Sequence, residues 1–344
     1  MSIKNLFLFG GTLLVFSFYW LDCFHQSPKY YIPKPNYKLP VNPEQNDTVQ
    51  LGRMLFYDNI LSANNEVSCA SCHNSYNAFA HTDHDLSHGI YDSIGNRNAP
   101  ALFNLAWQKE FMWDGAIHHI EAQALAPLHD SRELGSSIEE LLIKLRSSSF
   151  YRNEFFKVYG DSLINSKRVL QSLSSFELSL ISFNSKYDRV KQQKEVFTKQ
   201  EKQGYLLFQN HCNRCHTEPL FSNFEYLDNG LTVDPFLQDF GRFLITNVEK
   251  DKYKFKVPSL RNISYTYPYM HDGRFLKLNE VLDHYEGIQK INQGRIINLE
   301  KPIKLSFNER ADLISFLFTL NDEHFVFNQN HAFPNRLKEE LIKD

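Results

Sequence analysis

Apolar residues recur at the spacing of an α-helix through most of the chain, and no sustained alternation with a period of two competes with them. The pattern therefore predicts an all-α fold. Its clearest example is a segment that should form one long amphipathic helix and close the first half of the protein. The apolar positions of this helix are Leu170, Leu173, Phe176, Leu180 and Phe183.

Two further helices should begin at a capping box, in which a Ser or Thr is followed three residues later by Glu. The two pairs are Thr198 with Glu201 and Ser306 with Glu309. A charged stretch, residues 186–198 (KYDRVKQQKEVFT), lies between the first of these helices and the helix before it. We therefore expect a domain boundary in this stretch.

The sequence contains an internal duplication. Residues 100–104 (PALFN) and 112–115 (MWDG) reappear as 258–262 (PSLRN) and 270–273 (MHDG), each 158 residues later. A weaker match lies upstream in each half, between residues 52–56 (GRMLF) and 204–208 (GYLLF). A repeat of this kind indicates two copies of one domain. We assign the copies to residues 45–192 and 193–344.

An apolar run extends from Leu6 to Leu21 near the N-terminus. It is shorter than the roughly 20 residues that span a bilayer, and it has the form of an export signal or a short anchor. We assign residues 1–24 to a signal peptide or a membrane or lipid anchor, because Cys23 follows the run directly. Residues 25–44 are interpreted as a Pro-rich linker. The remaining chain is expected in the periplasm, or anchored to the membrane and facing it.

Composition narrows the class of protein. The chain has 344 residues, with 37 Lys and Arg against 40 Asp and Glu, and a formal net charge of −3. This balance argues against a nucleic-acid partner, which would select a strong positive excess. A content of 42% hydrophobic and 14% aromatic residues excludes a disordered chain. The length fits about two ordinary domains.

Four of the five cysteines belong to two CxxCH motifs, which are Cys69-Ala-Ser-Cys72-His73 and Cys212-Asn-Arg-Cys215-His216. This motif attaches a c-type haem: the two thiols form thioethers, and the histidine binds the iron from the proximal side. A four-cysteine zinc site is the main alternative, but it leaves both histidines unexplained. A thiol redox pair is a weaker one, because neither motif follows a strand. The cysteines therefore predict two haems.

Further motifs accompany the haem sites in a fixed order. They are residues 97–100 (RNAP), 113–115 (WDG), Gln123, 133–135 (ELG) and 267–273 (YPYMHDG). With these motifs the chain resembles the bacterial di-haem cytochrome c peroxidases, and particularly their MauG-like branch, over about residues 45–325. The resemblance implies two tandem cytochrome c-like haem domains. It also implies that hydrogen peroxide reacts at one haem while the other relays electrons.

For the first haem, the resemblance implies His73 as proximal ligand, Glu133 as the acid and base that moves protons, and Gln123 in the same pocket. Typical members place a distal histidine seven residues before the RNAP arginine, where this chain has Ile90. We therefore expect an open iron. Histidines near this position are alternative ligands, although loop histidines are more often simply exposed. These are His81, His84 and His88.

For the second haem, the resemblance implies His216 as proximal ligand and Tyr285 as sixth ligand, where peroxidases have methionine and MauG-like proteins have tyrosine. A tyrosinate stabilises higher oxidation states of iron. Met270 and His284 are competing ligands. The duplication pairs Tyr285 with Pro127, which has no donor atom in its side chain, and this supports an open first haem.

Between the haems, the resemblance implies that Trp113 is an aromatic step for electrons, although any buried tryptophan can also be a packing residue. It further implies a calcium ion held by Asn98, Thr266 and Pro268, since hard cations prefer oxygen donors. No acidic loop in the sequence requires calcium by itself.

Three functions follow as hypotheses. The first is a peroxidase that reduces hydrogen peroxide with electrons from a small cytochrome c or cupredoxin. The second is a MauG-like oxidase that removes electrons from side chains of a partner protein. The third is a non-catalytic di-haem electron carrier, which the expected open iron and Glu133 disfavour. The sequence names neither the donor nor a protein substrate.

Overall fold

The computed structural model describes residues 30–288 and 303–342. The apolar N-terminal run and Cys23 lie outside these residues, so the expected signal or anchor is not described. The described chain is mostly helical, as predicted, with one pair of two-residue strands. None of its helices is both long and apolar enough to cross a membrane.

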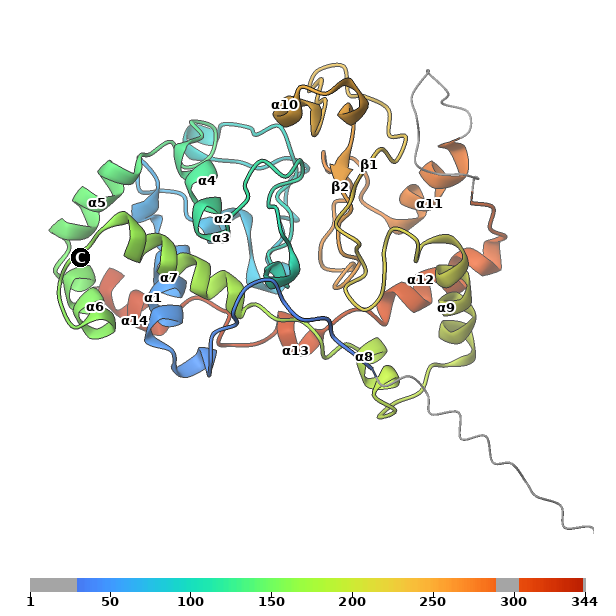
Figure 1. Cartoon of the computed structure of the whole chain (residues 1–344), viewed down its shortest axis with the longest axis horizontal. Helices are drawn as coiled ribbons and strands as arrows, with labels where there is room; N and C mark the ends of the chain where they lie inside the picture. Colours follow the sequence, from blue (N-terminus) through green and yellow to red (C-terminus); the bar gives the residue numbers. More distant parts are fainter. Residues whose placement is uncertain (1–29, 289–302, 343–344) are drawn as a thin grey trace, which may run out of the picture.

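The elements fall into two groups in chain order (Figure 1). The first group comprises α1 (Asp47–Tyr57), α2 (Cys69–Cys72), α3 (Ile120–Gln123), α4 (Leu125–His129), α5 (Ile138–Ser147), α6 (Ser149–Tyr159) and α7 (Ser166–Ser179). The second comprises α8 (Lys186–Lys191), α9 (Lys199–His211), β1 (Tyr226–Leu227), α10 (Phe243–Thr246), β2 (Phe255–Lys256), α11 (Leu278–Gly287), α12 (Phe307–Phe318), α13 (Glu323–Val326) and α14 (Asn335–Leu341). Although α14 belongs to the second group in chain order, it lies beside α1 and α6 of the first (Figure 1). Short 3₁₀ segments occupy Pro43–Gln45, Asn59–Leu61, Ser75–Asn77, Ile90–Asp92, Leu105–Trp107 and Glu249–Asp251.

Each group contains one close helix crossing, made possible by a glycine. In α1, a Cβ on Gly52 would lie 1.8 Å from the carbonyl oxygen of Ser172 in α7. In α9, a Cβ on Gly204 would lie 1.9 Å from the carbonyl oxygen of Asp312 in α12. The absence of a side chain at these two positions therefore lets each pair of helices touch through the backbone. Both glycines belong to the weaker match of the duplication.

The stronger matches also adopt the same local structure. The backbone N–H of Asn104 donates to Leu180 over 2.8 Å, and that of Asn262 donates to Leu320 over 3.1 Å. Both asparagines have a left-handed backbone, with φ of 56° and 57°. The pairs Phe111 with Ile117 and Tyr269 with Phe275 form equivalent bridges, with 2.7 Å hydrogen bonds. The sequence repeat is thus a repeat of backbone contacts.

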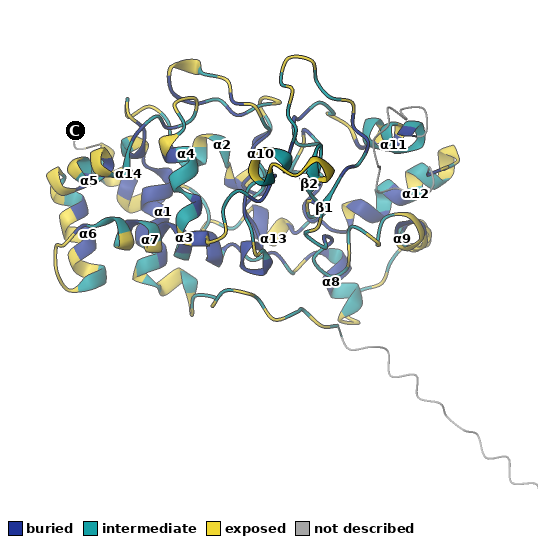
Figure 2. Cartoon of the chain, turned by 45° about the horizontal axis from the view of Figure 1, so that its top comes forward, coloured by how far each residue is buried: buried dark blue, intermediate teal, exposed yellow. Residues whose placement is uncertain are grey.

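The buried apolar side chains form two clusters (Figure 2). The first contains residues of α1, α5, α6 and α7, and the second contains residues of α8, α9, α11 and α12. The C-terminal segment returns to the first cluster through Phe325, Val326 and Leu337. Tyr187 lies on α8, within the stretch 186–198 where a domain boundary is expected, and is buried in the second cluster. The domain bounds at residues 192 and 193 stay a prediction.

The structure corrects one helix and confirms two. The helix predicted to reach Phe183 ends at Ser179. The amide of Asn104 draws the chain away from the helix, since it accepts from the N–H of Ser182 over 2.9 Å and donates to the carbonyl of Ser182 over 3.0 Å. Both predicted capping boxes are present, at the starts of α9 and α12.

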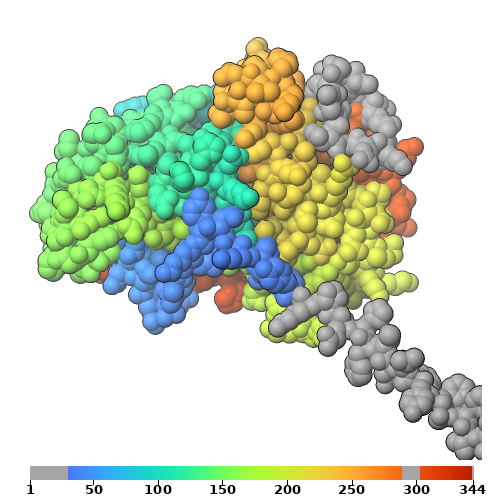
Figure 3. Space-filling view, in the orientation of Figure 1, coloured from blue at the N-terminus to red at the C-terminus, as the bar shows by residue number. Residues whose placement is uncertain are grey.

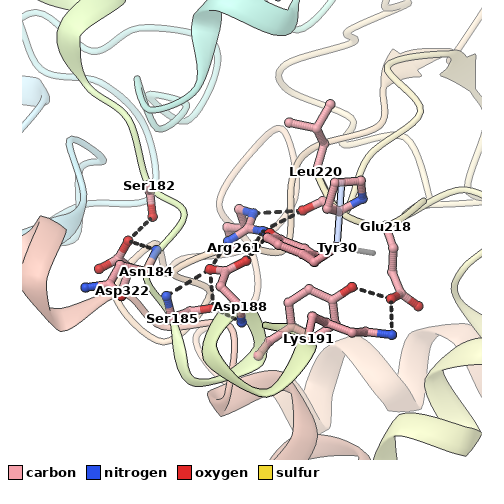
Figure 4. Close-up of polar contacts among 12 residues, drawn as sticks. Tyr30, Ser182, Asn184, Ser185, Asp188, Lys191, Glu218, Leu220, Arg261 and Asp322 are labelled. Carbon is pink, nitrogen blue, oxygen red and sulfur yellow. Dashed lines mark hydrogen bonds and ion pairs between the residues drawn. The ribbon is translucent and has the colours of Figure 1, made fainter. Parts of the chain in front are cut away.

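A buried ion pair lies where the chain passes from the first group to the second (Figure 4). Arg261 and Asp188 are fully buried and form two hydrogen bonds of 2.7 and 2.8 Å. Tyr30 also donates to Asp188. The segment that begins at Tyr30 continues across both groups (Figure 3), and Trp107 donates from Nε1 to the carbonyl of Pro33 over 2.6 Å. This junction therefore fixes the N-terminal segment to both halves.

Candidate functional site

The second CxxCH motif lies at the end of α9 and opens on a cavity. Cys212 is the C-cap of α9, and both thiols of the motif are free. The Nδ1–H of His216 donates to the carbonyl of Pro258 over 3.1 Å. Because Nδ1 is engaged in this way, Nε2 is the nitrogen left for a metal. Burial lowers the pKa of His216 to about 4, which keeps the imidazole neutral.

The cavity has a volume of about 300 Å³, which lies in the range of cofactor pockets, roughly 300–1,000 Å³. Residues of both halves line it, among them Cys212, Cys215, His216 and Tyr285 from the second half and Trp113 and Gln123 from the first. The structure therefore brings the second motif and its predicted sixth ligand to one cavity. It also places the predicted inter-haem tryptophan on the wall of that cavity.

The three candidates for the sixth ligand of the second haem iron differ in whether they line the cavity and in what they contact. Tyr285, on α11, lines the cavity, and burial raises the pKa of its phenol to about 12. Met270 also lines the cavity, and its sulfur accepts from the amide of Asn229 over 3.4 Å. His284 is not among the lining residues, and its Nε2 contacts the carbonyl of Asn229 at 3.1 Å. The geometry favours Tyr285 over His284, while ligation by Tyr285 stays a prediction.

The first CxxCH motif forms the short helix α2. The Nδ1–H of His73 donates to the carbonyl of Phe79 over 2.9 Å, and burial lowers the pKa of this histidine to about 4. The Sγ of Cys72 donates to the carbonyl of His88 over 3.3 Å. The Nδ1 atoms of His73 and His216 are thus both bound to a backbone carbonyl, that of Phe79 for His73 and that of Pro258 for His216.

Glu133 lies in the turn that follows α4, and its carbonyl accepts from the N–H of Ile90 over 2.9 Å. Ile90 is two residues from His88, whose carbonyl accepts from Cys72 of the first motif. The side chain of Glu133 is partly buried. Burial, with a smaller contribution from Asp130, raises the pKa of Glu133 above its usual value. The predicted acid and base is therefore beside the first haem motif, and its proton affinity is shifted towards neutral pH.

Ile90 is held against the same turn. Its N–H donates to the carbonyl of Glu133 over 2.9 Å, and its side chain is 4% exposed. A Cβ on Gly135 would lie 2.2 Å from Cδ1 of Ile90, and Gly135 has φ of 58°. The position that holds a distal histidine in typical peroxidases is thus filled by an aliphatic side chain packed on the Glu-Leu-Gly turn.

The three nearby histidines form a small cluster of their own. The rings of His84 and His88 stack with centroids 4.0 Å apart, and His81 contacts His84 at 5.4 Å. His88 also pairs with Asp92 at 3.2 Å. Among the residues that the structure describes, no three His, Cys, Asp or Glu side chains converge to hold a metal ion. The four motif cysteines do not form the alternative zinc site.

Trp113 connects the two halves. Its Nε1–H donates to the carbonyl of Asn98 over 2.8 Å, and the N–H of Asn98 donates to the carbonyl of His271 over 2.8 Å. Thr266 and Pro268 line the same cavity as Asn98. The residues predicted to hold calcium therefore line one cavity, and calcium binding stays a prediction.

Two ion pairs of Arg97, between the two halves near Trp113, were not predicted from the sequence. Arg97 forms a 2.6 Å ion pair with Asp114 of its own half and another of 2.6 Å with Asp239 of the second half. Arg97 and Asp114 belong to the RNAP and WDG motifs, but the motifs do not indicate that these two residues pair. No signal in the sequence points to Asp239, because the contact joins residues 142 positions apart.

The donor sets fit two covalently held haems. Each half supplies two free thiols and a neutral histidine whose Nδ1 is occupied by a carbonyl. In the second half these groups open on a cavity. A bound haem would supply an iron that accepts or donates electrons, and the protein would hold it through the thioethers and the proximal imidazole.

Comparison with known proteins agrees with this site. Residues 46–196 match the family model for di-haem cytochrome c peroxidase. The chain is 33% identical to the methylamine utilization protein MauG of Methylorubrum extorquens, over 85% of this chain and 81% of that protein. It is 32% identical to the cytochrome c551 peroxidase of Nitrosomonas europaea, over 82% of each chain.

Among solved structures, a MauG-like protein associated with microbial copper homeostasis is similar, with a TM-score of 0.73 and 29% identity. The similarity covers 88% of this chain and 97% of that one. The diheme peroxidase BthA from Burkholderia thailandensis shares the fold, with a TM-score of 0.72. Two haem-attachment motifs, each with a supported proximal histidine, and relatives along most of its length show that this chain belongs to the di-haem cytochrome c peroxidase family, a family of peroxidase-type oxidoreductases.

Proposed function

We propose that the protein reduces hydrogen peroxide to water beside its first CxxCH motif and receives the electrons through the second from a small cytochrome c or cupredoxin. The two haems would lie in two tandem cytochrome c-like domains. The observation that carries this proposal is the position of Glu133, a partly buried carboxyl with a raised pKa in a turn that binds the N–H of Ile90, next to the segment whose His88 carbonyl accepts from Cys72.

Reduction of one peroxide molecule to two water molecules consumes two electrons and two protons. Cleavage of the O–O bond is easier when one group takes a proton from one oxygen and returns it to the departing oxygen. Glu133 suits this role because its raised pKa lets it gain and lose a proton nearer neutral pH. For Gln123 the support is weaker, because this buried residue lines the cavity of the second motif; its contact with peroxide stays a prediction.

Ile90 supports an open site for the peroxide. It cannot bind iron, and its side chain is buried against Gly135. His88, the nearest alternative in sequence, pairs with Asp92 and stacks on His84. Peroxide would therefore not have to displace a protein ligand before it reacts.

A second candidate function is a MauG-like oxidation of side chains on a partner protein. Tyr285 favours it, since a phenolic oxygen facing the second cavity would stabilise an oxidised iron there. Trp113, on the same cavity, would carry electrons between the halves. We further propose a periplasmic location, a tether at the N-terminus, and one structural calcium ion at Asn98, Thr266 and Pro268.

Replacement of Glu133 by Gln tests the peroxidase proposal. The variant should consume peroxide about 10²–10⁴-fold more slowly, the usual contribution of a general acid and base, with unchanged haem content. Glu121→Gln is the matched control, because it removes an exposed carboxyl from α3. Equal rates for Glu133→Gln and the wild type would show that Glu133 does not move the proton.

One equivalent of peroxide, added to the ferric protein without a donor, separates the two candidates. Rapid loss of the Soret absorbance of both haems, with a long-lived oxidised state, would support the MauG-like function. Rapid return to the ferric spectrum on addition of a reduced small cytochrome c or cupredoxin would support the peroxidase. No spectral change with peroxide would contradict both.

A further inference from the structure

The phenol of Tyr226 lies beside the segment that carries Trp113. Strand β1 pairs with β2, with Tyr226 opposite Lys256, and the N–H of Lys256 donates to the carbonyl of Trp113 over 2.7 Å. These strands lie on the side of the second half that faces the first (Figure 1). A Cβ on Gly115 would lie 2.0 Å from the hydroxyl oxygen of Tyr226. The phenol is therefore packed against the backbone two residues from Trp113.

Tyr226 has a proton acceptor, Glu110, which in turn contacts an exposed histidine. Its hydroxyl donates to Oε2 of Glu110 over 2.7 Å. The other carboxylate oxygen of Glu110 is 3.2 Å from Nδ1 of His118, whose side chain is 63% exposed. Burial acts to raise the pKa of Glu110, but the hydrogen bond from Tyr226 and the charge of Arg242 hold it below its usual value. Glu110 is thus an ionised base in hydrogen-bond contact with the phenol.

Arg242 decides which oxidised form of Tyr226 is stable. Its guanidinium lies over the phenol ring, 3.7 Å from the centroid, and Nη1 contacts both Glu110 and the carbonyl of Asp114. A positive charge on the ring would be repelled by this cation. Oxidation of the ring would therefore have to be accompanied by loss of the hydroxyl proton, for which Glu110 is already placed.

Other phenol–carboxylate pairs in the described chain lack one of these features. Tyr151 donates to Asp58, and Tyr187 donates to Glu218, but both phenols are 1% exposed. Tyr205 also donates to Glu218, but its hydroxyl is bound by Lys191 as well and no contact joins it to the Trp113 segment among the described residues. Tyr30 donates to Asp188, but the Asp188 carboxylate also forms an ion pair with the guanidinium of Arg261. Tyr226 combines a partly exposed ring, a base that contacts an exposed histidine, and closeness to Trp113.

We propose that Tyr226 is a redox relay through which electrons from a one-electron donor at the protein surface reach Trp113, with Glu110 as the base that takes the hydroxyl proton and returns it. The inference rests on the proposed function, because the reaction with hydrogen peroxide beside the first motif is what would leave Trp113 oxidised. Both candidate functions draw electrons from outside the protein, and this route would deliver them to Trp113 in addition to the entry through the second CxxCH motif.

The relay step balances in atoms and charge. One electron leaves the phenol of Tyr226 for the oxidised Trp113, the O–H bond breaks, and the proton moves to Oε2 of Glu110. The products are reduced Trp113, a neutral tyrosyl radical and a protonated carboxyl. A donor then returns one electron to the radical while Glu110 returns the proton. Two such cycles supply the two electrons that one peroxide molecule consumes.

The test uses the full-length di-haem protein, mixed with one equivalent of peroxide without a donor and frozen for electron paramagnetic resonance. We expect a tyrosyl signal that narrows when the tyrosine rings are deuterated. Tyr226→Phe should lose this signal. Tyr31→Phe, which removes a phenol 69% exposed on the N-terminal segment, should keep it. A tyrosyl signal that persists unchanged in Tyr226→Phe would overturn the relay, as would its absence from the oxidised wild type.

Loss of the haem Soret absorbance, recorded in the same samples, reports the reaction with peroxide and keeps failure of the proposed function distinguishable from failure of the relay. A second measurement needs no peroxide: a photogenerated one-electron oxidant in solution oxidises Tyr226 directly. In Glu110→Gln this oxidation should slow by about 10²-fold, because the proton acceptor is removed. Equal rates in Glu110→Gln and wild type would refute the role of Glu110.

Discussion

The glycine at the crossing of α9 and α12 offers a sharp test of how the second half is held together. In Gly204→Ala, the new Cβ would begin 1.9 Å from the carbonyl oxygen of Asp312 and 2.8 Å from Cβ of Phe316, whereas ordinary contact begins at 3.4 Å. The nearest obstacle is backbone, so the two helices must move apart rather than a side chain rotating away.

Two opposing terms set the size of the effect. Alanine is favoured over glycine in a helix by about 1 kcal/mol. Overpacking a filled interior costs about 1–3 kcal/mol, and we take the upper end because a main-chain atom is displaced. The expected result for Gly204→Ala is a net loss of about 2 kcal/mol in the free energy of unfolding. At about 2–4 °C per kcal/mol, the midpoint of thermal unfolding falls by roughly 4–8 °C.

The matched control is Gly287→Ala, at the end of α11, where an added Cβ would meet no atom of the described residues within 4 Å. This variant should keep the wild-type stability or gain up to about 1 kcal/mol. The assay is urea and thermal unfolding of the haem-loaded protein, followed by circular dichroism. If Gly204→Ala proves as stable as Gly287→Ala, the crossing is not held by backbone contact and the reasoning fails.

Three further predictions follow from single contacts. Tyr285→Phe should convert the second haem from low spin to high spin in its absorption and paramagnetic resonance spectra; an unchanged spectrum would favour Met270. Asp188→Asn should lower the free energy of unfolding by about 3–5 kcal/mol in urea, because the buried charge of Arg261 loses its partner; a loss no larger than that of Asp161→Asn, in an exposed pair, would count against it. Burial raises the pKa of Glu177 from 4.5 to about 8, so the folded state holds this proton longer than the unfolded state and stability should fall as the pH rises from 4.5 to 8. In Glu177→Gln, the urea midpoint should fall less as the pH rises from 4.5 to 8 than it does in the wild type. An identical pH dependence in both proteins would contradict the assignment to Glu177.

The glycine and asparagine contacts show why a sequence repeat is informative about local structure. Gly52 and Gly204 stand at matching positions and make the same crossing, and Asn104 and Asn262 make the same turn. Each of these contacts depends on residues whose type is itself diagnostic, because only glycine lets two backbones touch so closely. Prediction from sequence is strong where the type of a residue is compatible with only one local structure.

Prediction is weaker where a contact depends on distant residues. The helix expected to reach Phe183 stops at Ser179, because Asn104 binds the backbone of Ser182. Local spacing favours helix there, and a side chain from 78 positions away decides against it. The same holds for Arg97, whose partner Asp239 carries no motif.

By itself, the sequence determined the covalent chemistry of this protein: two CxxCH motifs, their order, and the duplication that contains them, because thiols and imidazoles at fixed spacing admit few other uses. Only the tertiary structure decided which of the remaining polar groups meet. It brought Tyr285 rather than His284 to the second cavity, packed Ile90 on the turn of Glu133, and set Glu110 against Tyr226 across 116 positions. Side-chain spacing along a chain is local, whereas burial and proton transfer depend on neighbours in space.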